Sequence, residues 1–324
     1  MCKPLGASHC DKQFSKTNQS MAFEMSEKDK VVLSIFINEQ KENGTFFNHY
    51  IDALTKFIVE ITEKLAAAKV ELKRHEDNFE IHYFKFVLQS LSLKHLFEGT
   101  PINSIIAGQR LHDISSIYNC TRSLLKSFLT INYLYYNHKT EDQATFRYLL
   151  YVVSGINNRQ SYPVNSEDMK TKLEFERKEI LKRLEEIKTN PYFKTLHPEK
   201  KNYILGKLQA YEIGKKEIIT ESGLDHSVLH TMWSLYSNYS HSEFIEAMQL
   251  KEYIKDVSKY NGTLYNTYRL CFMLICYQIT KMTERFPLAK EMYENQDLEI
   301  KTIIESYNKL FLGLSLKKPE TPPI

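Results

Sequence analysis

The stretch of sequence that decides the fold runs from Asp113 to Asn137 and reads DISSIYNCTRSLLKSFLTINYLYYN. Its apolar residues recur at intervals of three and four, which is the spacing of one face of an α-helix. The second half of the stretch is apolar on almost every side, and such a helix is typical of the buried centre of a bundle. The stretch therefore predicts a central helix that is surrounded by other helices.

The composition of the whole chain supports the same fold class. Its 324 residues include only 10 Gly and 9 Pro, well below the average usage of about 7% and 5%. Tight hairpins and βα crossovers depend on residues that adopt positive φ or begin a turn. We therefore expect an all-α protein, a multi-helix bundle with long helices and no significant β-sheet.

The few glycines, prolines and capping residues predict the helix boundaries. Long helices are expected over residues 26–44, 45–72, 78–97, 113–137, 140–159, 166–188, 225–241, 253–285 and 297–311, with shorter ones after Pro198 and Pro287. The bundle is expected to span residues 25–312, with a possible hinge near 161–166 between two lobes; one continuous bundle is an equal alternative. Residues 1–24 are expected to be a disordered extension, with Met21 and Met25 as alternative starts, and residues 313–324 a loose tail.

Charge, cysteines and motifs exclude several function classes. The net charge of +3 is too small to argue for nucleic acid or an anionic membrane. Five unevenly spaced cysteines predict a reduced, cytoplasmic protein. The apolar run Leu270–Ile279 is far shorter than the roughly 20 residues that span a bilayer, so no membrane partner is expected. Glycine-rich phosphate loops and zinc-protease motifs are absent, and no cofactor is predicted.

One predicted helix, residues 225–242 with the sequence DHSVLHTMWSLYSNYSHS, contains no Lys, Arg or Glu. A helix face turned to water normally carries such residues, so we expect both faces to be covered or to line a cleft. One face is apolar. The opposite face carries imidazoles, hydroxyls and the only Trp of the chain, which suit a planar or phosphorylated ligand or proton transfer near neutral pH. The candidate ligand-binding residues here are His230, Trp233, Tyr236, Ser237 and Ser240, with His241 as a candidate catalytic residue.

A structural interpretation of the same helix stays open, because small hydroxyls also permit close helix packing and buried histidines are often simply hydrogen-bonded. His226 and His230 have the i, i+4 spacing of a metal chelate. The helix offers them no Cys or Glu as a further ligand, so no metal site is predicted.

Arg122 is the second candidate catalytic residue. It lies on the central helix, on the same face as Tyr118 and Leu125, and a partly buried Arg requires an acceptor. An ion pair with a carboxylate of a neighbouring helix is the favoured interpretation, and an anion site facing the 225–242 helix is the alternative. Arg147, a candidate ligand-binding residue, and Arg159 could join either arrangement.

Several short motifs resemble an uncharacterised family of helical bacterial proteins. They are Arg-Ser-Leu-Leu at 122–125, Phe146-Arg147, a charged hairpin, Gly223 and Tyr-Ser-Asn-Tyr-Ser-His-Ser at 236–242. Over residues 105–250 the chain is loosely similar to the HEPN-like helical bundles of prokaryotic defence and toxin systems. The Arg-x4-6-His motif of HEPN ribonucleases is absent, and Lys126 stands where an acidic residue is expected. The resemblance implies a helical bundle and a bacterial setting.

Three hypotheses about function follow. The first is a HEPN-like, defence-associated module that binds a nucleotide, RNA or a protein partner through the Ser/His/Trp face. The second is a metal-independent ribonuclease or other hydrolase, with His241 as acid/base and Arg122 holding the phosphate charge. The third is a structural protein in which the same face forms a homo-oligomer interface.

Overall fold

The computed structural model describes residues 25–42, 45–102, 110–224, 226–240, 244–256 and 261–316, and this part of the chain is almost entirely helical. The predicted all-α class is confirmed. The only sheet in the described part of the chain pairs two strands of two residues each, β1 (Thr100–Pro101) and β2 (Arg110–Leu111). The α-helices are α1 (Glu27–Glu42), α2 (Thr45–Ala67), α3 (Phe79–Phe97), α4 (Ile114–Ile131), α5 (Glu141–Arg159), α6 (Glu167–Thr189), α7 (Pro191–Thr195), α8 (Pro198–Lys207), α9 (Lys215–Glu221), α10 (His226–Ser240), α11 (Phe244–Lys255), α12 (Asn261–Arg285), α13 (Pro287–Glu294) and α14 (Leu298–Leu316).

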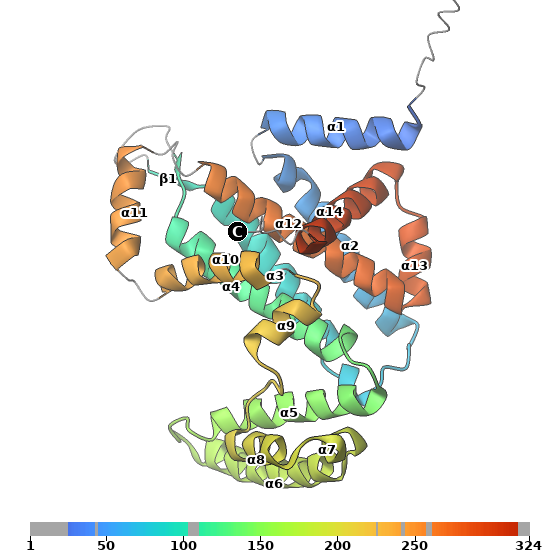
Figure 1. Ribbon diagram of the computed structural model, residues 1–324, viewed down its shortest axis with the longest axis vertical. Coiled ribbons are helices and arrows are strands. Elements are labelled where there is room, and N and C mark those ends of the chain that lie inside the picture. Colours follow the sequence, from blue (N-terminus) through green and yellow to red (C-terminus); the bar gives the residue numbers. More distant parts are fainter. Residues whose placement is uncertain are drawn as a thin grey trace, which may run out of the picture.

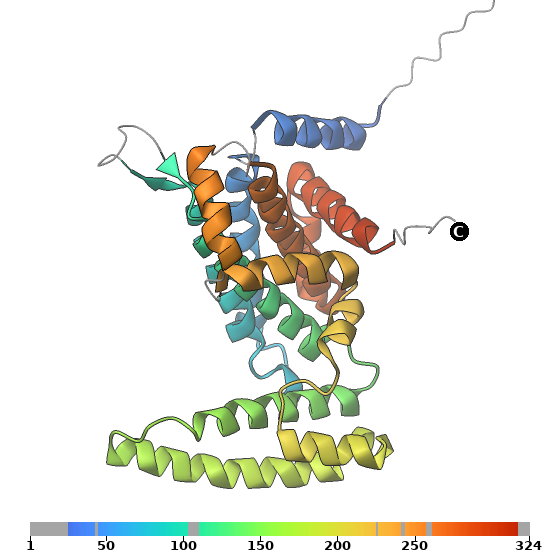
Figure 2. The same cartoon turned by 60° about the vertical axis from the view of Figure 1, so that its left-hand side comes forward.

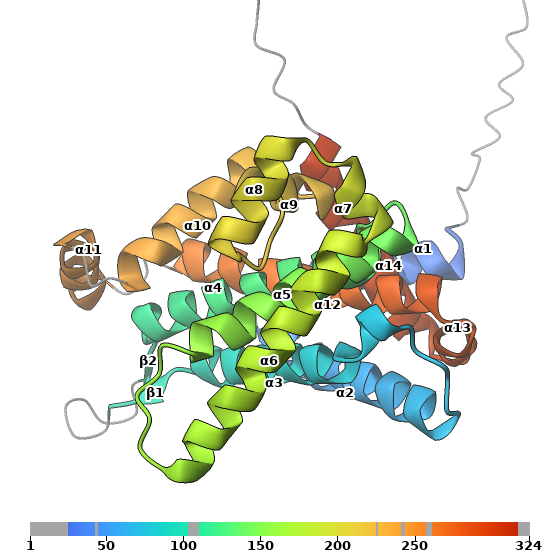
Figure 3. The same cartoon turned by 90° about the horizontal axis from the view of Figure 1, so that it is seen from below.

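The helices form two groups, each with its own apolar core (Figure 1). The larger group contains α1–α4 and α9–α14. The smaller group, α5–α8, lies at one end of the molecule, and α6 extends along its outer side (Figure 2). Seen from below, α6 crosses the larger group at a steep angle (Figure 3). The polar, highly charged sequence of α6 fits this peripheral position.

Helix α4 is the buried centre that its sequence predicts. Its N-terminus is capped by Asp113, whose carboxylate accepts a hydrogen bond from the Ser116 N–H at 3.0 Å. The apolar residues from Ile114 to Ile131 are buried against α3, α10 and α12. The chain then continues as a π-helical turn, Asn132–Tyr136, which the sequence did not predict.

Capping residues begin several helices where the sequence places them. The hydroxyls of Ser26, Thr140 and Ser166 each accept a hydrogen bond from the N–H three residues later, at 3.1, 3.2 and 3.2 Å. Such bonds satisfy N–H groups that have no partner within the helix. Gly99 closes the turn after α3 with a φ of 75°, a conformation that a side chain would strain.

Two predicted boundaries are wrong. Helix α2 ends at Ala67 and does not reach Leu72, because Lys69 adopts a φ of 50° and the Val70 N–H bonds back to the Leu65 carbonyl at 3.1 Å. This closing motif usually has Gly at the position of positive φ, so a Lys there is no signal for the end of a helix. The predicted helix 253–285 is two helices, since Tyr253 belongs to α11 and α12 begins at Asn261.

The two helix groups are not joined at the predicted hinge. Residues 161–166 join α5 to α6 inside the smaller group. The chain enters that group through residues 137–140 and leaves it through 208–214. Residues 1–24 lie outside the described part, and α14 extends to Leu316, four residues into the predicted C-terminal tail. Among the helices described, none has an apolar stretch long enough to cross a bilayer.

Candidate functional site

The apolar face of α10 packs across α4. Leu229, Tyr236 and Tyr239 are buried there, and the ring of Tyr118 lies 5.1 Å from that of Tyr236 and 4.7 Å from that of Tyr239. Aromatic pairs at such distances stabilise a helix contact beyond simple area burial. This contact fixes how the opposite face of α10 is presented.

Tyr236 belongs to this core contact. It is fully buried, and its hydroxyl lies 3.3 Å from the hydroxyl oxygen of Thr267 on α12. Burial raises its pKa well above the ordinary value, so the phenol stays protonated. Of the proposed ligand-binding residues, Tyr236 therefore faces the protein interior.

The opposite face of α10 is covered only in part. His230 is exposed, its ring lies 5.3 Å from that of His226, and Ser237 and Trp233 are half-buried. His241 and the side chain of Ser240 lie outside the described residues. No group of three or more His, Cys, Asp or Glu side chains in the described ranges is placed to hold a metal ion.

Trp233 is the residue of this face around which positive charges gather. The ammonium of Lys215, the first residue of α9, lies 4.0 Å from the ring centroid, and the guanidinium carbon of Arg122 on α4 lies 5.9 Å from it. Both distances are within the range of a cation–π contact. The structure thus brings together Arg122 and Trp233, two residues that the sequence analysis selected separately.

A pocket of about 530 Å³ opens beside this cluster. Its lining is mostly apolar and includes the ring of Trp233. Two ammonium groups, those of Lys126 and Lys215, stand at it. The described lining residues include no carboxylate and are Lys126, Leu129, Gln209, Tyr211, Ile213, Gly214, Lys215, Ile218 and Trp233.

Among the described residues, the three cations have no carboxylate as counter-ion. The buried Nε of Arg122 has no hydrogen-bond partner, and within the described ranges no carboxylate forms an ion pair with Arg122, Lys126 or Lys215. Burial lowers the pKa of Lys215, and the positive charges of Arg122 and Lys126 lower it further. The nearest acid in sequence, Glu217, accepts a hydrogen bond from the Gly214 N–H at 2.7 Å. The favoured expectation of an ion pair for Arg122 is therefore not met among these residues.

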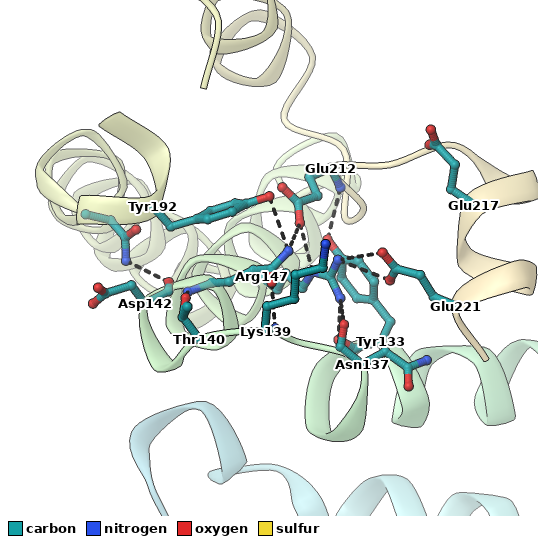
Figure 4. A network of polar contacts seen from close by, with 12 residues as sticks. Tyr133, Asn137, Lys139, Thr140, Asp142, Arg147, Tyr192, Glu212, Glu217 and Glu221 are labelled. Atoms are coloured by element: carbon teal, nitrogen blue, oxygen red, sulfur yellow. Dashed lines mark hydrogen bonds and ion pairs between the residues drawn. The ribbon is translucent and has the colours of Figure 1, made fainter. Parts of the chain in front are cut away.

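Arg147 has the opposite environment (Figure 4). It is fully buried, its Nε donates to Glu212 at 2.8 Å, and its Nη2 lies 3.1 Å from a carboxylate oxygen of Glu221. Its Nη1 donates to the Asn137 carbonyl at 2.8 Å, and its guanidinium carbon lies 4.3 Å from the ring centroid of Tyr133. All of its nitrogens are engaged, so this candidate ligand-binding residue has no donor left for a ligand.

The Arg147 network nevertheless shapes the pocket. Glu212 and Glu221 stand on either side, in sequence, of the pocket-lining residues Ile213, Gly214, Lys215 and Ile218. The Glu212 N–H donates to the Tyr133 hydroxyl at 3.0 Å. Burial works against the charge of Arg147, yet the bond to Glu212 and the nearby negative charges raise its pKa. The network thereby fastens the pocket wall to α5. Arg159 pairs with Glu176 on α6, away from the pocket.

Sequence reasoning missed Lys215 and Tyr211 as lining residues. It noted Lys126 one turn after Arg122 and as a departure from a motif, but did not assign it to a site. Lys126 follows Arg122 by one helical turn, which is a usable signal. Lys215 is one of many lysines in a charged stretch, and only the packing of α9 against α10 places it over Trp233.

A larger cavity of about 600 Å³ lies elsewhere, at the contact of α1, α2 and α12. Its carboxylate, Glu39, is already paired with Arg269 at 2.9 Å and accepts a hydrogen bond from the Tyr265 hydroxyl at 2.5 Å. No Lys or Arg is among its described lining residues. The other oxygen of Glu39 is buried without a hydrogen-bond partner, so the charge that this cavity presents is negative. It therefore offers less to an anionic ligand than the pocket at Trp233 does.

Comparison of the chain with protein-family models, with curated proteins and with solved structures found no match. Functional inference therefore depends on the geometry of the pocket.

Proposed function

We propose that this chain binds a small anionic ligand with a planar body, of which a nucleotide is the representative, in the pocket between α4, α9 and α10. The observation that carries the proposal is that Arg122 and Lys215 lie against Trp233, with Lys126 in the same pocket lining, and that none of the three has a carboxylate partner in the described residues. Like charges that repel one another in the free protein are stabilised by a bound anion, and charge-assisted hydrogen bonds to phosphate are among the stronger ones.

The remaining lining supports a planar body. The lining is mostly apolar, and an indole ring provides a surface on which a base can stack, a contact worth about 1–3 kcal/mol in nucleic-acid complexes. Ligand pockets commonly combine an apolar lining with a few placed polar groups. A planar group would displace the Lys215 ammonium from the Trp233 ring, and that ammonium would then be available to the anion.

The biological setting belongs to the same proposal. A nucleotide or RNA ligand agrees with the resemblance to HEPN-like bundles, with a role in bacterial defence and with a cytoplasmic location. Each of these is inferred from short motifs and from composition, and each stands or falls separately from the pocket.

The test uses Trp233 as its own reporter, because it is the only Trp of the chain. Titration of the purified protein with AMP and ATP should change its fluorescence in a saturable manner. Arg122→Ala and Lys215→Met should each weaken binding about tenfold or more, as expected for one charge-assisted hydrogen bond. Lys216→Ala, a neighbouring exposed lysine outside the pocket lining, is the matched control.

Two outcomes would overturn the proposal. One is that neither nucleotide binds, by fluorescence or by calorimetry. The other is that both bind equally well to the wild type, Arg122→Ala and Lys215→Met, which would place the ligand elsewhere.

Three further measurements test the ribonuclease, RNA-binding and oligomer hypotheses. Cleavage of labelled RNA that is lost in His241→Ala would identify a ribonuclease. Tighter binding of single-stranded RNA than of any mononucleotide would make RNA the ligand. A change of molecular mass in solution on Trp233→Ala would indicate a homo-oligomer or protein interface in place of a ligand pocket.

A further inference from the structure

The pocket at Trp233 holds more positive charge than one phosphate requires. Lys126 and Lys215 line the pocket, Arg122 lies beside it near the Trp233 ring, and the described lining residues include no carboxylate. A phosphate monoester carries a charge of about −1.5 to −2 near pH 7, so a single one would leave part of this charge uncompensated. Each further phosphate group adds negative charge.

The cations are also not confined to one point, because Arg122 and Lys126 lie one helical turn apart on α4 and Lys215 is close enough to feel the charge of both. Arg122 and Lys215 both lie against the Trp233 ring, at 5.9 and 4.0 Å from its centroid. Lys126 lies one helical turn further along α4, a rise of about 6 Å, and its side chain is exposed at the pocket. Such an arrangement fits a chain of phosphates better than a single tetrahedral anion.

We infer that the ligand is a nucleoside polyphosphate, a di- or triphosphate, whose first phosphate is held by Arg122 and Lys215 and whose outer phosphate is held by Lys126. This inference rests on the function proposed above and names the ligand class of the same pocket. The base occupies the position of the Lys215 ammonium on the Trp233 ring, and the ammonium moves to the phosphate. That exchange is favourable, because a charge-assisted bond to phosphate is stronger than an exposed cation–π contact.

The absence of a carboxylate among the described lining residues has a consequence for metal ions. Sites that hold a nucleotide with Mg²⁺ usually supply carboxylates to the metal. Here the polyphosphate binds as the free anion, and Mg²⁺, which neutralises part of its charge, competes with the three cations.

The experiment compares AMP, ADP, ATP and cyclic AMP on the full chain by Trp233 fluorescence, with EDTA present. ADP should bind about tenfold more tightly than AMP, since it gains one charge-assisted contact, and cyclic AMP, with a single negative charge, should bind most weakly. Excess Mg²⁺ should weaken ADP binding. Lys126→Ala should abolish the preference for ADP and leave the affinity for AMP nearly unchanged, and Lys216→Ala should alter neither.

The outcomes separate this inference from the proposed function. If AMP binds as tightly as ADP and ATP, or if Lys126→Ala keeps the preference, the polyphosphate class is refuted and the planar-anion pocket still stands. If none of the four nucleotides binds, the proposed function fails as well.

Discussion

Arg122 and Arg147 lie on consecutive long helices, α4 and α5, yet the structure uses them in opposite ways. At the junction of α5 with the larger helix group, which we refer to as the α5 junction, Arg147 is fully buried and pairs with two carboxylates. At the pocket, Arg122 stands beside two lysines and an indole ring, and its buried Nε has no partner.

The difference teaches where to look for a site when no motif is present. A buried arginine with all its donors engaged stabilises the fold and cannot bind anything further. Cations that repel one another at the edge of a cavity contribute little to folding, and such an arrangement is typical of functional sites. The comparison predicts that substitutions at the α5 junction change stability and that substitutions at the pocket change binding.

The largest effect is expected for Arg147→Met. Removing this guanidinium leaves Glu212 buried without its partner, so the free energy of unfolding should fall by about 3–5 kcal/mol. Urea denaturation measures this change in the free energy of unfolding. Arg177→Met, an exposed arginine of α6, is the control and should change stability by no more than about 0.5 kcal/mol. Equal stability of Arg147→Met and the wild type would show that Arg147 does not stabilise the fold and would contradict the comparison with Arg122.

The second effect is a pH dependence at the same junction. His82 bonds to the hydroxyls of Tyr135 and Tyr151 at 2.7 and 3.2 Å, and burial, with a smaller effect from Lys85, lowers its pKa to about 4. Because the unfolded chain has a His pKa near 6.5, protonation favours the unfolded state below that pH. Stability should fall by about 2 kcal/mol between about pH 7 and pH 5 on account of His82.

Urea denaturation of the wild type and of His82→Gln at both pH values isolates this contribution. Glutamine cannot be protonated, so the variant should lose less stability on acidification. His75 and His138, whose pKa values burial also lowers, contribute in the same direction in both proteins. An identical pH dependence of the two proteins would show that His82 titrates normally.

A smaller effect is expected for Tyr236→Phe, on the buried side of α10. The change removes the hydroxyl near Thr267 and keeps the ring contact with Tyr118. Loss of one buried hydrogen bond should lower the free energy of unfolding by about 1 kcal/mol, and nucleotide affinity should stay within twofold. If Tyr236→Phe lost nucleotide binding without losing stability, Tyr236 would be a ligand-binding residue and not part of the core contact.

The smallest change of stability is expected for Arg122→Gln. No ion pair with a described carboxylate is broken, and the repulsion on Lys215 is relieved, so the free energy of unfolding should change by no more than about 0.5 kcal/mol. A loss comparable to that of Arg147→Met would mean that both arginines are structural and would contradict the comparison directly.

Helix existence was predictable in this chain because local signals agree with one another. The apolar period of α4, the caps Ser26, Thr140 and Ser166, and the positive φ of Gly99 all act over a few residues. The errors had two causes. Lys69 ends α2 in a conformation that favours Gly, so a local signal was missing there. The Asn261-Gly262 pair at the start of α12 is a signal for a break that the prediction of one long helix did not use.

The candidate site was predictable only in part. Trp233 and Arg122 were selected because each is unusual in its own helix, and Arg147 was selected because it lies on the following helix and could join the arrangement of Arg122. The environments of these residues differ because different side chains from other helices or loops lie next to them. Lys215 lies over the indole of Trp233, and Glu212 lies beside the guanidinium of Arg147.

The sequence by itself thus determined the fold class, most helix boundaries and the buried faces of α4 and α10, since these depend on periodicity and on capping within one segment. Only the tertiary structure decided which charges are neutralised. Whether a charge has a counter-ion depends on groups that lie far away in sequence, as Arg147 and Glu212 do at a separation of 65 residues. The packing of the helices decides which of these groups come into contact.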